Sequence, residues 1–197
     1  MRFRWFGTEI YVSFLFAAVL AALLICDRTG LLLPTLIAVT VHESGHLVAM
    51  RLAGCAPKSI RLVPASVQIT RPFCPKPQAE IGIALAGPGA NLCAALSCWM
   101  LHCQSGRPLW LVNTLLHLLI GAFNLLPVAG LDGGTVLREG LQRRCSPKTA
   151  CRIMRGVTAV TVALLIAGGI GLWRQNRGNY SLFAVALYLA VTAAAKR

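Results

Sequence analysis

The sequence has few charged residues and very few acidic ones. Of its 197 residues, 13% are charged, and six Asp and Glu stand against 19 Lys and Arg. A soluble globular domain carries about a quarter charged residues, so the composition excludes that class. Aromatic residues are also scarce, at 7%. No basic stretch is interleaved with aromatic side chains for base stacking, so the net charge of +13 does not indicate a nucleic-acid partner.

The cysteines lack the close pairing typical of metal-binding ribbons. The chain has eight of them and no C-x-x-C pair. Several fall within or beside apolar runs, where cysteine behaves as a small hydrophobic residue. Their spacing therefore supports neither a disulfide framework nor a cysteine-built zinc site.

What the sequence does have is long apolar runs. Hydrophobic residues make up 56% of the chain, and the mean hydropathy is +0.68. Several runs approach the roughly 20 residues that a helix needs to cross the hydrocarbon core of a bilayer. The expected fold is an all-α polytopic membrane protein, a single domain over 1–197 with about six transmembrane helices. The predicted spans are 10–26, 31–53, 79–101, 109–126, 157–173 and 180–195.

The basic residues fall in alternate loops between these spans. With a cytoplasmic N-terminus, only four Lys and Arg lie outside: Arg28, Arg107, Arg174 and Arg177. This is the positive-inside pattern. The sequence thus predicts a multi-pass protein of a lipid bilayer with both termini in the cytoplasm.

Three stretches depart from plain apolar helix. Residues 59–70 alternate apolar and polar residues in two short runs, which predicts a small β-hairpin at the membrane edge. Gly87-Pro88-Gly89 is expected to break the third span near its middle, because proline removes a helix hydrogen bond. The basic segment 138–155 has a pattern compatible with a helix.

The second span contains the motif His-Glu-x-x-His at 42–46. Residues four apart share one face of a helix, so His42 and His46 can direct two imidazoles at one metal ion. Glu43 follows the first histidine and can act on a water at that ion. An ionised carboxylate is costly inside a bilayer and indicates a functional site by default. Zinc suits imidazole nitrogen and keeps one position open in a catalytic site.

A catalytic zinc usually takes three protein ligands. Asp132 is the favoured third ligand, because it lies in an irregular Pro- and Gly-rich break at the same membrane side as His46. Asp132 can instead cap the helix that follows it. Glu80 is a second candidate. His117 is a third, although a lone histidine in a span more often bonds a neighbouring helix.

The motifs resemble those of the site-2 protease family of intramembrane zinc metalloproteases. Besides His-Glu-x-x-His, the similar motifs are Gly87-Pro88-x-x-Asn91 in the third span and Asn124-x-x-Pro127-x-x-x-x-Asp132-Gly133, which begins in the fourth. The resemblance covers residues 31–134. It implies one zinc ion held by His42, His46 and Asp132, Glu43 as general base, and Asn91 and Asn124 near the substrate. No stretch resembles a PDZ or CBS domain.

The expected function is that of a zinc metalloendopeptidase acting on a membrane-associated protein near the cytoplasmic side, in regulated intramembrane proteolysis. The six-span layout is most similar to the stage IV sporulation protein FB branch, which implies a sporulation pro-sigma factor as substrate. That branch also implies a bacterial cell membrane or the membrane around a forespore. The alternatives are an anti-sigma factor or another membrane protein as substrate, or a non-proteolytic zinc-binding or transport protein. The expected partners are the membrane-associated substrate and regulatory membrane proteins.

Overall fold

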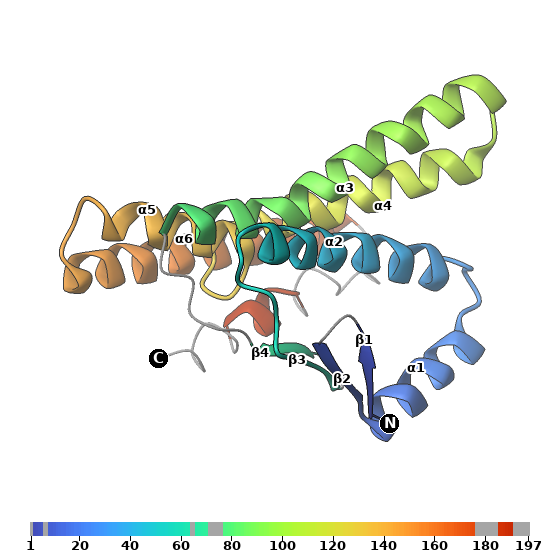
Figure 1. Ribbon diagram of the computed structural model, residues 1–197. Helices are drawn as coiled ribbons and strands as arrows, with labels where there is room; N and C mark the ends of the chain where they lie inside the picture. The colour runs from blue at the N-terminus through green and yellow to red at the C-terminus, as the bar shows by residue number, and fades with distance from the viewer. Residues whose placement is uncertain (1, 6–7, 64–65, 71–76, 176–184, 191–197) are drawn as a thin grey trace. The chain divides into compact units, whose positions relative to one another are not determined.

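The computed structural model of the protein describes residues 2–5, 8–63, 66–70, 77–175 and 185–190 (Figure 1). The chain divides into two compact units, 1–122 and 123–197. The described part is mostly helical, as the composition predicts. The predicted single domain over 1–197 stays a prediction.

The first unit contains a four-stranded sheet in the order β1-β2-β3-β4. β3 (Ser59–Val63) and β4 (Ser66–Thr70) pair antiparallel, which confirms the predicted hairpin. β1 (Arg2–Trp5) and β2 (Thr8–Val12) form a second hairpin, and β2 runs parallel to β3. The prediction that a membrane helix begins at Ile10 is therefore wrong. The reason is that Thr8–Val12, rich in β-branched and aromatic residues, finds strand partners on both sides.

The turn after α1 (Phe14–Cys26) is organised by one carboxylate. Asp27 accepts hydrogen bonds from the backbone N–H groups of Thr29, Gly30 and Leu32 and from the Thr29 hydroxyl, at 2.7–3.1 Å. These bonds hold the pKa of Asp27 below its usual value, chiefly through the Thr29 hydroxyl and then the Leu32 amide. The turn leads directly into α2 (Leu32–Leu52), the helix of the His-Glu-x-x-His motif.

α2 ends at a glycine with a left-handed backbone. Gly54 has φ +72°, and its N–H donates to the carbonyl of Arg51, while the N–H of Cys55 donates to the carbonyl of Met50. This pair of bonds satisfies two carbonyls in the last turn of the helix. Cys55 then packs with Met50 and Ile83 in a small buried cluster. Cys55 also forms a disulfide bond, which the cysteine spacing did not predict.

α3 (Pro77–Ser105) is one continuous helix with Pro88 inside it. The expected break at 87–89 is thus not present. Membrane helices tolerate an internal proline where neighbouring elements accommodate it, and here α2 and α4 (Pro108–Asn124) both contact this part of α3. A side chain at Gly45 of α2 would lie 2.8 Å from Cβ of Ala90, and one at Gly121 of α4 would lie 3.6 Å from the Pro88 carbonyl oxygen.

The second unit contains α5 (Asp132–Gln142) and α6 (Pro147–Gln175). The basic segment 138–155 is helical except at the turn between them, and α6 continues without interruption through the predicted fifth span. Within the predicted sixth span, residues 185–190 are described and form helix. Residues 180–184 and 191–195 of that span lie outside the described part.

Three of the described helices are long and apolar enough to cross a membrane: Leu32–Leu52, Gln78–Ser105 and Pro147–Arg174. Phe14–Cys26 and Pro108–Asn124 are shorter apolar helices. Large apolar side chains on these helices are exposed, as expected for surfaces that face lipid; examples are Ile37, Val48, Leu92, Leu96, Val160 and Leu164.

Candidate metal centre

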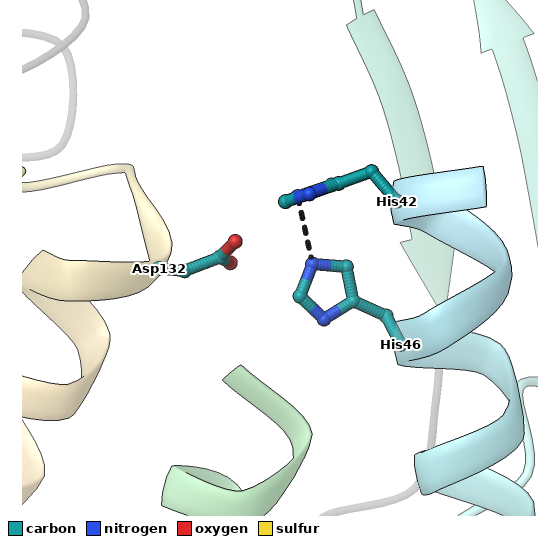
Figure 2. Close-up of side chains that lie close together, drawn as sticks. All are labelled: His42, His46 and Asp132. Atoms are coloured by element: carbon teal, nitrogen blue, oxygen red, sulfur yellow. Dashed lines mark hydrogen bonds between the residues drawn. The ribbon is translucent and has the colours of Figure 1, made fainter. Parts of the chain in front are cut away.

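The two histidines of α2 lie one turn apart and point their rings at each other (Figure 2). His42 and His46 are 4% and 7% exposed, so both side chains are buried inside the protein. Their Nε2 atoms are 3.1 Å apart. Two nitrogens bound to one tetrahedral zinc at about 2.05 Å would be roughly 3.3 Å apart. The spacing of this pair therefore fits two ligands of one zinc ion.

His46 is held by the backbone of α3. Its Nδ1–H donates to the carbonyl oxygen of Ile83 at 2.7 Å, and this carbonyl can only accept. The bond therefore fixes the proton on Nδ1 and leaves the lone pair of Nε2 for a ligand. An outer hydrogen bond of this kind is the usual support of a metal-binding histidine.

The two rings can lie where they do because residue 87 is a glycine. A Cβ at Gly87 would run into Nε2 and Cε1 of His46, and it would lie 2.9 Å from Cε1 of His42. The missing side chain therefore lets both rings lie directly against the backbone of α3. Two imidazole nitrogens at the spacing of one zinc ion fit zinc by their chemistry, and Gly87 is what allows their rings this position. Sequence analysis placed Gly87 in a helix break and missed this role.

His42 is held by α3 as well, through a side chain. The amide of Asn91 lies 3.3 Å from Nδ1 of His42, and its oxygen lies 3.1 Å from Nδ1 of His117 on α4. Asn91 is fully buried. His117 is therefore bonded to a neighbouring helix, as expected for a lone histidine. Among the described residues, neither His117 nor Glu80 joins a group of three side chains that could hold a metal ion.

Asp132 lies in the second unit as the first residue of α5, and Figure 2 also draws its side chain. The N-cap residue of α5 is Leu131, whose side chain makes no capping bond, so Asp132 is the first helical residue and not the N-cap. It is half-buried, and its Oδ2 atom is buried.

The chain folds back over the start of α5, where Gly133 and Gly134 admit the carbonyls of Leu125 and Val128 in contact with their backbone. The amide of Ala129 donates to the hydroxyl of Thr158 on α6 at 3.2 Å. The first turn of α5 is therefore packed against the loop that precedes it, and that loop is bonded to α6.

The remaining predicted site residues lie on the same elements. Glu43 is half-buried on α2, one residue after His42. Asn124 is half-buried and is the last residue of α4.

The chain is similar to known zinc metalloproteases by several comparisons. The family model of peptidase family M50 matches residues 101–168. Rip3 of Mycobacterium tuberculosis, provisionally assigned as a zinc metalloprotease, is 33% identical over 192 residues, covering 87% of this chain and 48% of the relative. A zinc metalloprotease of Methanocaldococcus jannaschii is 26% identical, covering 82% of this chain and 50% of the relative.

The solved structure of a site-2 protease from Methanocaldococcus jannaschii has a TM-score of 0.69 and 25% identity, covering 98% of this chain and 93% of that one. The chain spans about half the length of the curated relatives it matches. Taken together, the family model, the curated relatives and the solved structure support the site-2 protease (M50) family of zinc metalloproteases as the family of this chain.

Proposed function

We propose that the protein is an intramembrane zinc endopeptidase that hydrolyses a peptide bond of a membrane-associated protein. The observation that carries the proposal is the histidine pair of α2, with Nε2 atoms 3.1 Å apart and with Gly87 making room for both rings. The helix that holds this pair is long and apolar enough to cross a membrane. Site-2 protease homologues among the relatives support the same chemistry.

The proposed ligands are His42, His46 and Asp132, a His-His-Asp group that is consistent with zinc. The two histidines belong to the first unit and Asp132 to the second, so the third ligand rests on the motif spacing and on the buried Oδ2 atom of its carboxylate. When bound, zinc supplies a Lewis acid that lowers the pKa of water towards about 7.

Glu43 is the proposed general base. Its carboxylate takes a proton from the attacking water as the oxygen of that water adds to the scissile carbonyl, and it returns the proton to the leaving amine. The bond formed is C–O, the bond broken is the amide C–N, and one water is consumed. Asn124 is proposed to contact the substrate backbone, where an amide N–H can stabilise the developing oxyanion. Asn91, predicted near the substrate, is in contact with His42 and is considered below.

The substrate must be extended at the scissile bond, because a helix hides its carbonyls in its own hydrogen bonds. β4 is paired with β3 and stands at the edge of the sheet of described strands. An extended segment of substrate can add to such an edge.

A pro-sigma factor and an anti-sigma factor are the substrates to test first. The sporulation pro-sigma factor as substrate stays a prediction that the comparisons do not support. The multi-pass topology in a bacterial membrane and the cytoplasmic termini also stay predictions.

The test is co-expression with a membrane-associated pro-sigma or anti-sigma factor, comparing wild type with Glu43→Gln. The expected result is cleavage by wild type alone, with about one zinc per chain in both purified proteins. Ser44→Ala is the matched control, because Ser44 is exposed and bonds only the Thr40 carbonyl of its own helix in the described contacts. Equal cleavage by wild type and Glu43→Gln would refute the protease assignment. Zinc retained after His42 and His46 are both replaced would refute the metal centre.

A further inference from the structure

A chain of hydrogen bonds leads away from His42 through Asn91 to His117 on α4. The two links measure 3.3 Å and 3.1 Å, and the three side chains are 4%, 0% and 3% exposed. Buried polar groups in a membrane protein are costly unless they are bonded. The proposed peptidase chemistry does not explain the two bonds from Asn91 to His42 and His117.

The direction of the bonds in this chain follows from its fixed end. The Ile83 carbonyl accepts from Nδ1–H of His46, so Nε2 of His46 carries a lone pair and accepts from Nε2–H of His42. Nδ1 of a neutral His42 then has no proton and accepts from the amide N–H of Asn91. The oxygen of Asn91 is left to accept from Nδ1–H of His117.

A metal ligand at His42 requires the opposite direction. Nε2 of His42 must then offer its lone pair, so its proton resides on Nδ1. That Nδ1–H needs an acceptor. Asn91 provides one if its side-chain amide rotates by 180° about the Cβ–Cγ bond, so that its oxygen faces His42. The amide N–H now faces His117, whose Nδ1 must accept and whose proton must move to Nε2. A histidine at 117 can serve in both directions because it has two neutral tautomers.

We propose that His117 is a positioning residue for the metal centre, acting through Asn91. This inference rests on the proposed function, since it assigns His117 the task of holding Asn91 in the orientation in which His42 can bind zinc. Zinc loading thereby reverses the two hydrogen bonds of the chain and changes the tautomer of a histidine on another helix. The alternative is a plain bond between helices, worth about 0.6 kcal/mol on average.

The first measurement distinguishes a tautomer relay from a plain bond between helices. With four histidines in the chain, ¹⁵N-histidine NMR of the full chain in detergent micelles can assign each ring by single replacements. We expect His117 to carry its proton on Nδ1 without zinc and on Nε2 with zinc. A tautomer at His117 that does not change on zinc loading would overturn the proposal, whatever the activity of the protein.

The second measurement is zinc affinity by chelator competition. Loss of an outer hydrogen-bonding partner typically weakens metal binding about 10- to 100-fold, and we expect that range for Asn91→Leu and about tenfold for His117→Leu. His117→Gln offers an acceptor oxygen to Asn91 and should bind within about threefold of wild type, a conservative rescue at the weak end of that range. Thr114→Val is the control, because Thr114 is buried on the same helix and bonds the Trp110 carbonyl.

The double variant Asn91→Leu/His117→Leu completes the cycle. If His117 acts through Asn91, its removal should add no loss once Asn91 is gone. Additive losses, or a His117→Leu protein that binds zinc as tightly as wild type, would overturn the proposal. Those results leave the peptidase assignment intact if wild type binds zinc and cleaves. A wild-type protein that binds no zinc would refute both. Should His117→Leu fail to fold, His117→Gln and the wild-type tautomers still decide.

Discussion

Replacing Gly87 with alanine should disable the metal centre while changing a single methyl group. The added Cβ would collide with Nε2 and Cε1 of His46 and would lie 2.9 Å from Cε1 of His42. α2 and α3 also pack closely at Gly45, where a Cβ would lie 2.8 Å from Cβ of Ala90, so moving the helices apart would cost this packing. The rings must therefore rotate away, which breaks the 2.7 Å bond from His46 to the Ile83 carbonyl.

The size of the effect follows from the cost of overpacking. Inserting a methyl group into a filled interior costs about 1–3 kcal/mol. If the rings give way and the helices do not, this cost falls on zinc binding. A loss of roughly five- to 150-fold in zinc affinity corresponds to that range.

The control is Gly89→Ala, two residues along the same helix. Within the part of the chain that the structure describes, a Cβ at Gly89 would meet no atom of a neighbouring element within 4 Å. Alanine is also the better helix former by about 1 kcal/mol. We expect Gly89→Ala to bind zinc like wild type and to be equally or more stable to heat in detergent. Chelator competition measures the affinities, and thermal unfolding confirms that both variants are folded. A folded Gly87→Ala protein with wild-type zinc affinity would refute the role of Gly87 in making room for the two histidine rings.

Two further predictions concern the parts of the first unit that surround the site. Asp27 has a lowered pKa because of the Thr29 hydroxyl and the Leu32 amide, so its contribution to stability is present above about pH 4 and is lost as the pH falls through its folded pKa. The difference in melting temperature between wild type and Asp27→Asn should therefore shrink as the pH is lowered below about 4; a difference independent of pH would contradict this. Ile69→Pro, which removes one N–H from β4, should slow substrate cleavage while zinc content stays at the wild-type level, and unchanged cleavage would remove β4 from substrate binding.

The first strands show where local pattern reasoning reaches its limit. Thr8–Val12 precedes a long apolar run, so hydropathy alone joins it to the helix that follows. Its partners are β1, a few residues before it, and β3, about 50 residues later. The parallel pairing with β3 depends on α1 and α2 returning the chain to the same edge, and no local spacing encodes that return. The hairpin of β3 and β4 was predictable because its two strands alternate and are adjacent in sequence.

The third span shows the opposite error, a break predicted where the helix continues. Proline removes one hydrogen bond from α3 at Pro88, and that rule is local. Whether the helix survives depends on what packs there, and the Pro88 carbonyl lies against Gly121 of α4. The sequence identified the right residues, since Gly87, Pro88 and Asn91 lie on the part of α3 that faces the histidines and α4. It could not separate Gly87, where an added Cβ would collide with the rings, from Gly89, where an added Cβ would meet none of the described atoms.

The same limit applies to His117 and explains why its role needs coordinates. Two histidines four residues apart on one helix lie on the same face, so His42 and His46 could be found from their spacing alone. His117 is 26 residues from Asn91, and Asn91 is 49 from His42. Their connection exists only because the fully buried Asn91 of α3 contacts both His42 of α2 and His117 of α4. The direction of each bond is then dictated by one carbonyl that can only accept, that of Ile83. A set of metal ligands can be predicted from residue types and spacing. The tautomers in which the histidines can bind the metal depend on which buried donor faces which buried acceptor in the folded protein.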